Sequence, residues 1–452
     1  MKTRFRRASL KPLSLAKKFS VKSVEVDFFA VKRIVIATLA IVLCCWAIWE
    51  AARTGIARTL AERAELTDDI NSADRAIKFA PNDAEAHFAR GEVLQSSEDY
   101  AEASVEFERA VQLRPRDYFL WLMLGVTRDA NQDQEVALRA LRQAAVLAPS
   151  YAAPRWQLGN LLLRMGQYDE AFAELRRAAI GNPKLWPNVI DLAWGVYGGD
   201  VDAVLKVIQP QSQEARLSLA LFLARHNQAA AALGQFRLSA LTDSAKNESL
   251  LDELLKARAF NEAYEVWGRI HGLALRTLPD GRVSDTSAGI RDGGFEEPIT
   301  VGQSGFGWQI TPNVANVTMS VETNERHDES RSLRIDFRGN SSPTSPLLTQ
   351  LVLVKPQIHY RLGFAALAKD FVSAAAPTVT ITDASDQKNA VLAESMPLRP
   401  DVAGWRDFAI DFNTSAQTQA IFITVARQSC ASDPCPAFGT LWLDSFSLST
   451  GR

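Results

Sequence analysis

The chain has 452 residues, of which 47% are hydrophobic and 23% are charged, a composition typical of globular proteins. This length exceeds what one hydrophobic core usually organises, so we expect two or three folded units. The 50 basic and 52 acidic residues give a net charge of -2, which excludes a broadly basic nucleic-acid-binding protein and an acidic disordered chain. Four cysteines exclude a small scaffold built on many disulfides.

The N-terminal region combines a basic segment with an uncharged one. Residues 1–33 carry ten basic and two acidic side chains, a net charge of +8, so the rest of the chain carries -10. Residues 34–49 carry no charge and, as a helix, would cover about 24 Å of a hydrocarbon core roughly 30 Å thick. Flanking residues can extend the segment because long basic side chains reach back to the interface. We predict a transmembrane anchor at residues 34–52.

This apolar segment has two other interpretations. A buried core helix would show polar residues at helical spacing, and the segment has none. A cleavable signal peptide is disfavoured because the basic region is 33 residues long and no clean small-residue cleavage site follows it. The distribution of basic residues then predicts a single-pass protein with a cytoplasmic tail at residues 1–33. The bulk of the chain would lie outside, in the periplasm if the membrane is a bacterial inner membrane.

A repeat follows the anchor. Four prolines recur at intervals of 34 residues, at Pro81, Pro115, Pro149 and Pro183. The same interval aligns four further columns of small or apolar residues: Gly91, Gly125 and Gly159; Ala103, Ala137 and Ala171; Phe107, Leu141 and Leu175; Ala110, Ala144 and Ala178. This pattern resembles the tetratricopeptide repeat, with the best copy at residues 118–149. Small residues let two helices approach closely, and proline ends the second helix.

The chain departs from this family at both ends of the array. Residues 53–81 supply only a second helix by their sequence, and the next repeat has His87 and Arg90 where Trp and Leu are usual. Beyond Pro183 the interval is lost, but helical periodicity continues, so we expect degenerate repeats that extend an α-solenoid over residues 53–272.

The resemblance implies a protein partner that lies in a groove lined by the first helix of each repeat. The family's groove positions fall here on seven residues: Phe88, Glu92, Phe119, Leu122, Val126, Trp156 and Asn160. Each of these side chains could instead pack on the adjacent helix.

The pattern changes after residue 272. Residues 273–289 lack apolar periodicity and contain Pro, Asp and Gly in succession, so we expect a linker. Residues 290–452 then show alternating runs rich in β-branched residues, separated by Pro, Gly, Asn and Ser, which predict an antiparallel β-sandwich. The predicted strands are VTMSVE, SLRIDF, TQLVLV, HYRLGF, TVTITD, FAIDF, AIFITVA and TLWLDSFSL. The fold class is therefore multidomain α plus β.

The ends of this predicted sandwich carry a second resemblance. RDGGFEEP opens it, GFGWQI follows, and GTLWLDSFSL closes it, which resembles the galactose-binding-like jelly rolls among carbohydrate-binding modules. The resemblance implies a structural calcium ion where the first and last strands meet, with Glu296 and Asp444 as ligands and Asp328 or Glu329 as a further oxygen donor. The other interpretation is that Glu296 and Asp444 are solvated strand-end residues or partners of an arginine.

The jelly-roll resemblance also implies glycan binding. We expect Trp308, Trp405 and Trp442 to pack in the core, because they match positions that are mostly core in that family. Candidate glycan-binding residues instead lie opposite the apolar alternation of the strands: Arg334, Asp336, Arg361, Thr380, Phe422 and Thr424.

Cys430 and Cys435 flank the residues ASDP. Outside the cytoplasm two thiols at this spacing usually pair, and Asp and Pro favour the tight turn that a disulfide needs. A metal site would require further Cys or His nearby, so we predict a disulfide.

No nucleotide-binding, nucleophile-elbow or zinc-protease motif occurs, so we do not expect an enzyme. The leading hypothesis is a membrane-anchored extracytoplasmic scaffold. Its solenoid would bind a protein and its jelly roll a glycan, in cell-envelope or exopolysaccharide assembly or export. In the alternatives, the jelly roll is structural or protein-binding, or the sandwich is a glycan-processing enzyme with two carboxylates facing each other across a cleft.

Overall fold

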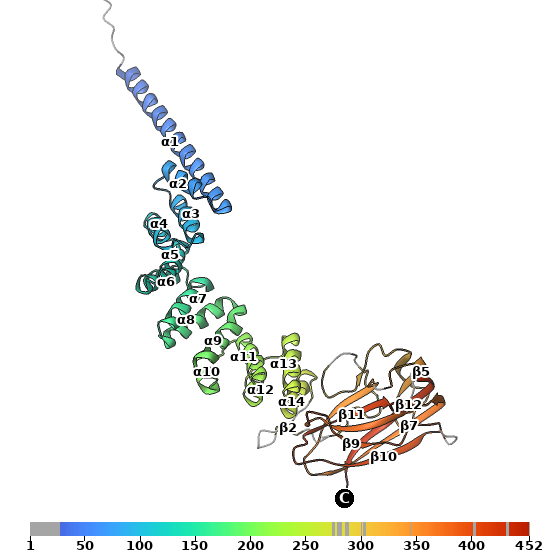
Figure 1. The fold of residues 1–452 in the computed structure, drawn as a ribbon. Helices are drawn as coiled ribbons and strands as arrows, with labels where there is room; N and C mark the ends of the chain where they lie inside the picture. Colours follow the sequence, from blue (N-terminus) through green and yellow to red (C-terminus); the bar gives the residue numbers. More distant parts are fainter. Residues whose placement is uncertain are drawn as a thin grey trace, which may run out of the picture. The chain divides into compact units, whose positions relative to one another are not determined.

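The computed structural model divides the chain into two compact units, a first unit of residues 1–149 and a second unit of residues 150–452 (Figure 1). The residues that it describes are 28–273, 276–277, 283–284, 289–299, 301, 304–343, 345–400, 404–430 and 434–451. The predicted cytoplasmic tail at residues 1–33 lies almost wholly outside the described residues.

The described part of the first unit is helical. Its helices are α1 (Phe28–Thr67), α2 (Ile70–Phe79), α3 (Ala84–Ser96), α4 (Tyr100–Leu113), α5 (Tyr118–Ala130) and α6 (Gln134–Leu147). Asp83 and Asp117, one repeat apart, begin α3 and α5 by accepting a backbone N–H of the first turn. The second helices α4 and α6 end two residues before Pro115 and Pro149, as the repeat pattern predicts.

The helix α1 continues without a break from the apolar segment into the repeats (Figure 1). By length and composition it could cross a membrane, and its apolar side chains are exposed. A signal sequence meets the same criterion. Further along, Ala57, Ala61 and Ala64 are at most 1% exposed and belong to the part of α1 that packs against α2 and α3. The prediction that residues 53–81 form only a second helix is therefore wrong, because the end of α1 is the missing first helix.

The second unit begins with eight helices, joined at one point by a short 3-10 helix. They are α7 (Ala152–Arg164), α8 (Tyr168–Gly181), η1 (Pro183–Leu185), α9 (Trp186–Val196), α10 (Val201–Ile208), α11 (Gln213–Arg225), α12 (Ala229–Arg237), α13 (Ser244–Lys256) and α14 (Phe260–Ile270). The helices beyond Pro183 agree with the predicted extension of the solenoid. Pro183 starts η1, and the repeat interval is lost there.

Two five-stranded antiparallel sheets follow. The first has the order β10-β7-β12-β5-β4 and the second the order β3-β6-β11-β8-β9. Their strands are β3 (Gln309–Ile310), β4 (Val317–Glu322), β5 (Ser332–Asn340), β6 (Leu348–Leu353), β7 (His359–Ser373), β8 (Pro377–Asp383), β9 (Val391–Glu394), β10 (Arg406–Asn413), β11 (Ala420–Arg427) and β12 (Pro436–Thr450). A two-stranded ladder of β1 (Arg276–Thr277) and β2 (Val283–Ser284) precedes them, inside the segment predicted as a linker.

The two large sheets enclose one hydrophobic core. Alternate residues of each strand face it, as in β5, where Leu333, Ile335 and Phe337 are at most 3% exposed. All eight predicted strand segments coincide with observed strands, whereas the short strands β3 and β9 were not predicted. The antiparallel sheets are as expected, while the jelly-roll identity stays a prediction.

The outer face of the second sheet is covered by the end of the solenoid. Phe306, which is 3% exposed, lies between Tyr264 and Trp267 of α14, with ring centres 4.9 and 5.7 Å away. Gly305 permits this approach, because a Cβ atom built there would lie 2.3 Å from the Trp267 ring. The Arg258 guanidinium, before α14, donates to the carbonyl of Ala384 over 2.7 Å. Helices and sheet therefore share one hydrophobic cluster within the second unit.

Candidate functional sites

The column of glycines sets how closely the two helices of a repeat approach. A Cβ atom built on Gly91 would lie 2.8 Å from the ring of Phe107, and one built on Gly125 would lie 2.6 Å from Leu141. Both distances are too short for carbon atoms in contact, so the large residue of the second helix fits only against glycine. This packing fixes the orientation of α3 and α5. It therefore also fixes which side chains of these helices face the predicted groove.

In the first unit the predicted groove positions divide by exposure. Phe119 is 43% exposed and its ring centre lies 5.7 Å from that of Phe88. Phe88 and Leu122 are 8% and 7% exposed, so they support the surface from below, while Glu92 and Val126 are half-buried. We call these five residues the first-helix face. The structure brings all five onto the first helices α3 and α5, with Phe119 as their exposed aromatic side chain.

Carboxylates gather beside this face. Burial raises the pKa of Glu92, and the negative charge of Glu85 raises it further. Burial likewise raises the pKa of Glu65, on the packed end of α1, followed by the charges of Glu92, Glu85 and Glu62. Neither Glu65 nor Glu92 forms an ion pair within the part of the chain that the structure describes. Sequence reasoning did not identify Glu65 as a site residue. The helical spacing of Ala57, Ala61 and Ala64 was the signal that could have indicated the packed helix on which it lies.

His87 stands where the family usually has Trp, and its ring forms its own hydrogen bonds within the same repeat. Trp121, at the equivalent position of the next repeat, donates its indole N–H to the carbonyl of Pro115 over 2.9 Å. His87 places Nε2 3.0 Å from the carbonyl of Pro81 and Nδ1 2.6 Å from a carboxylate oxygen of Glu106. Both neighbours are acceptors, so the doubly protonated ring satisfies both contacts.

The remaining two groove positions lie in the second unit. Trp156 is half-buried and packs against the unit's hydrophobic cluster, as the alternative to a groove role expected. Asn160 donates its side-chain N–H to the carbonyl of Trp156 over 2.9 Å. Arg155 on α7 pairs with Glu174 at 2.6 Å. These two residues stand two repeats after His87 and Glu106, at the equivalent positions.

The predicted calcium ligands hold one loop through backbone groups. Asp444, fully buried, accepts the backbone N–H groups of His327 and Asp328 on one carboxylate oxygen, at 2.8 and 3.2 Å, and that of Ser445 on the other. Burial raises the pKa of Asp444. Glu296 accepts the backbone N–H groups of residues 330 and 331, both at 2.8 Å. The two carboxylates thus bind neighbouring parts of the loop at residues 327–331.

Calcium at this position stays a prediction. Calcium needs six to eight oxygen ligands, whereas the oxygens here face N–H groups, and the Asp328 carboxylate accepts the hydroxyl of Ser445 at 3.1 Å. No group of three or more His, Cys, Asp or Glu side chains that could hold a metal occurs among the described residues. Thermal unfolding of the protein with added calcium and with a chelator tests the predicted calcium site.

The structure divides the predicted glycan-binding residues between the two sheets. Three lie on the first sheet, on β5 and β7: Arg334, Asp336 and Arg361. The other three lie on the second sheet, on β8 and β11: Thr380, Phe422 and Thr424. Thr424 pairs with Thr380 across the strands, but Phe422 packs against the cluster shared with the solenoid. The six residues therefore do not form one binding surface.

The polar side chains on the first sheet bind one another. Arg334 pairs with Asp336 at 3.0 Å and with Glu322 at 3.3 Å, and Glu322 also accepts the indole N–H of Trp442. The Arg334 guanidinium carbon and the Lys369 ammonium lie 5.5 and 5.3 Å from the centre of the Trp442 ring. Trp442 is only 6% exposed as a result, so its ring offers no open platform to a sugar.

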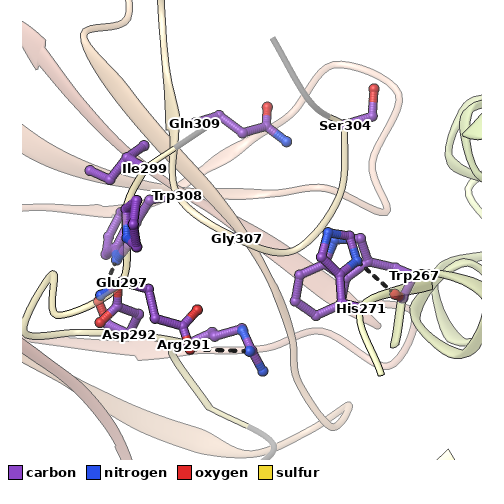
Figure 2. Close-up of a pocket in the computed structure, with 11 residues that line it drawn as sticks. Trp267, His271, Arg291, Asp292, Glu297, Ile299, Ser304, Gly307, Trp308 and Gln309 are labelled. Atoms are coloured by element: carbon purple, nitrogen blue, oxygen red, sulfur yellow. Dashed lines mark hydrogen bonds and ion pairs between the residues drawn. The ribbon is translucent and has the colours of Figure 1, made fainter. Parts of the chain in front are cut away.

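A cavity of about 120 Å³ lies in the second unit where α14 meets the start of the sandwich. Figure 2 shows Arg291 stacked near Trp267, with 5.2 Å from the guanidinium carbon to the ring centre, and paired with Glu297 at 3.5 Å. Asp292 accepts two backbone N–H groups of its own loop, and His271 donates to the Trp267 carbonyl. Arg291 and Glu297 pair with each other and Asp292 binds backbone groups, so this cavity is a polar joint between helix and sheet.

Cys430 and Cys435 are joined by a disulfide in the structure. Cys435 is 3% exposed and Cys430 is half-buried.

Comparison with known proteins addresses the repeats. Models of the tetratricopeptide repeat match residues 84–117 and residues 153–179. A peroxisomal targeting signal receptor of Candida albicans is 28% identical over 106 residues, 24% of this chain and 18% of the receptor. DnaJ homolog subfamily C member 3 of Mus musculus is 30% identical over 101 residues, 22% of this chain and 20% of that protein. The matched region is thus a small part of either relative.

Two solved structures are similar to about a third of this chain. A crystal structure of MamA is 20% identical, with 33% of this chain and 86% of that chain covered and a TM-score of 0.29. The structure of YrrB, described as a TPR protein with an unusual peptide-binding site, is 23% identical, with 36% and 88% covered and a TM-score of 0.29. The predicted tetratricopeptide repeats are confirmed by the family models, and such repeats indicate a protein-interaction scaffold.

Proposed function

We propose that this chain is a membrane-anchored scaffold whose first-helix face binds an extended segment of a protein partner. The exposed ring of Phe119 carries this proposal. It is 43% exposed in a well-packed repeat, it rests on the buried ring of Phe88, and it stands on the helix that lines the groove in this repeat family. When a partner covers a large aromatic side chain held in this way, its burial contributes favourably to the free energy of binding.

The neighbouring carboxylates define the chemistry of the bound segment. Glu65 and Glu92 each have a raised pKa because burial and neighbouring glutamates disfavour their charge. A basic side chain placed between them would relieve that repulsion, whereas an acidic one would add to it. The bound segment is therefore one that carries apolar and basic residues.

The membrane part of the proposal rests on α1. The apolar side chains of residues 34–49 are exposed, and the hydroxyl of Thr38 bonds to the carbonyl of Ile34 over 3.0 Å within the helix. Such an internally satisfied helix suits a lipid environment. The basic tail supports a proposed topology with a cytoplasmic N-terminus and with the repeats outside, in the periplasm if the membrane is a bacterial inner membrane. Protease added to intact spheroplasts tests this topology: it should digest the repeats, and protected repeats would contradict the proposal.

For the sandwich, the expectations are glycan binding, a structural or protein-binding role, and glycan processing by an enzyme. The packing of Phe422 against the solenoid and the cover of Arg334 and Lys369 over Trp442 favour structural support. A role in exopolysaccharide assembly or export rests on the combination of modules alone. Binding of the full chain to any polysaccharide on a glycan array would restore the glycan-binding role.

The experiment for the partner site is a peptide selection on the full chain in lipid nanodiscs. Peptides that combine apolar and basic residues should be enriched. Phe119→Ala should weaken their binding about tenfold, which corresponds to about 1.4 kcal/mol. Glu92→Gln should weaken the binding of basic peptides in particular and should reduce the salt dependence of binding.

The matched control is Val105→Ala, which removes an exposed side chain, 59% accessible, from the second helix α4. This variant should bind the selected peptides as the wild type does. Equal binding by the wild type and Phe119→Ala, or enrichment of acidic peptides, would contradict the proposed site.

A further inference from the structure

Arg427, at the end of β11, is a buried cation that faces only uncharged groups. It is 4% exposed, and its guanidinium donates to the carbonyls of Ala375 and Ser341 at 3.2 and 3.0 Å and to the hydroxyl of Ser373 at 2.9 Å. It also donates to Cys435, at 2.9 Å to the carbonyl and 3.0 Å to Sγ. No carboxylate pairs with Arg427 among the residues that the structure describes.

A buried guanidinium without a counterion costs free energy, because no nearby negative charge replaces the lost water. Burial accordingly lowers the pKa of Arg427. Among the atoms that its guanidinium contacts, Cys435 Sγ alone can take up a negative charge within the ordinary chemistry of a protein. It does so when the disulfide is reduced and the sulfur becomes a thiolate.

We propose that the Cys430–Cys435 disulfide is a redox-exchange site that reacts with a dithiol and whose reduced form is stabilised by Arg427. The two sulfurs are unequal, since Cys430 is half-buried and Cys435 is 3% exposed. The more accessible Cys430 is therefore the sulfur that an incoming thiolate attacks. Cys435 is the leaving group, and its departing thiolate forms 3.0 Å from the guanidinium.

The exchange balances with the dithiol as the only reductant. A thiolate of the dithiol attacks Cys430 Sγ, the bond between the two cysteine sulfurs breaks, and its electron pair passes to Cys435. The second thiol loses its proton to water and attacks the mixed disulfide, which releases Cys430 as a thiolate that takes a proton from water. The dithiol leaves as a disulfide, and the two cysteines have gained two electrons.

The test is the titration of Cys435 in the full chain in nanodiscs. Cys430→Ser, combined with serine at Cys44 and Cys45, leaves Cys435 as the single thiol, and absorbance at 240 nm follows its thiolate. With Arg427 in place the thiolate should form at least one pH unit below the ordinary cysteine pKa of about 8.5. Arg427→Lys should retain part of this effect, and Arg427→Gln should remove it.

A second measurement covers the case in which Arg427→Gln does not fold. In a dithiol redox buffer, Arg427→Lys should shift the equilibrium of the intact pair about tenfold toward the disulfide, because an ammonium makes fewer contacts to the sulfur. A Cys435 thiol that titrates at 8.5 or above beside the native arginine would overturn the proposal. So would an equilibrium that does not move in Arg427→Lys.

Discussion

At the scale of single residues, the first unit contains a histidine that its surroundings hold protonated. Burial acts to lower the pKa of His87, but the hydrogen bond and charge of Glu106 outweigh it and raise that pKa above the usual 6.5. For Glu106, burial acts to raise the pKa, but the contacts to His87 and Arg90 outweigh it and lower that pKa. The pair is thus an ion pair with low exposure, 10% and 15% of the two side chains.

This pair predicts how the stability of the first unit depends on pH. A raised histidine pKa contributes stability that is complete below about 6.5 and is lost as the pH rises through the folded-state value. The free energy of unfolding should therefore fall by about 1.5–3 kcal/mol between pH 6 and pH 8.5, the range for hydrogen bonds to charged groups. His87→Gln should remove this dependence. Hydrogen exchange of the α3 and α4 amides, corrected for intrinsic rates, measures it.

Trp121→Phe is the matched control, because it removes the equivalent hydrogen bond to a proline carbonyl without a titrating group. Its loss of stability should be the same at pH 6 and pH 8.5. If His87→Gln also lost equal stability at both values, folding would leave the pKa of His87 unchanged, which would contradict the ion pair with Glu106.

At the scale of the elements, α1 combines an exposed apolar half and a packed half in one helix of 40 residues. Its apolar half is exposed, while its second half packs through alanines at intervals of three and four residues, which lie on one helix face. Alanine lets helix backbones approach closely, and Ala61 meets Ala76 of α2 and Ala86 and Ala89 of α3. The apolar segment therefore continues into the first repeat as one unbroken helix.

Overpacking this contact should loosen the first unit. Ala61 is 1% exposed, so Ala61→Leu inserts three carbon atoms where no space exists and should cost about 1–3 kcal/mol. Chemical unfolding followed by circular dichroism measures the change. Leu66→Ala, on the same helix at a side chain 79% exposed, should change stability by less than about 0.5 kcal/mol. An Ala61→Leu variant as stable as the wild type would mean that α1 does not pack on α3.

At the scale of the whole molecule, the second unit joins helices and sheets through one hydrophobic cluster. The cluster runs from Phe172 on α8 to Ala420 on β11, and Phe306 connects its helical and sheet parts. The segment predicted as a linker therefore does not separate two independent domains. The sandwich has its own core between the sheets, so it contacts the solenoid through a second, outer surface.

Phe306→Ala should weaken this junction without unfolding the sandwich. Removal of a buried phenylalanine ring costs about 3–5 kcal/mol. The amides of α13 and α14 should then exchange faster with solvent, while those of β5 and β12 keep their protection. Val372→Ala, at a side chain 70% exposed on β7, is the control and should alter neither region. Loss of protection in β5 and β12 as well would show that the sandwich depends on the solenoid for its fold.

The amino-acid sequence alone determined features that repeat or alternate locally. The interval between prolines located the helix pairs, because proline cannot continue the interior of a helix. The alternation of apolar residues located eight strand segments and their inward faces, because successive side chains of a strand point to opposite sides. The groove positions Phe88 and Phe119 followed from the resemblance to the tetratricopeptide repeat.

The tertiary structure decided which distant residues meet. Alternation shows that Arg334 and Phe422 face away from the core, but not that they lie on different sheets, because strand order is set by long-range pairing. The pairs of His87 with Glu106 and of Arg427 with Cys435 also join separate elements. Such contacts leave no local period in the sequence, since they depend on how helices and strands pack, and the charged and redox chemistry of this protein lies in them.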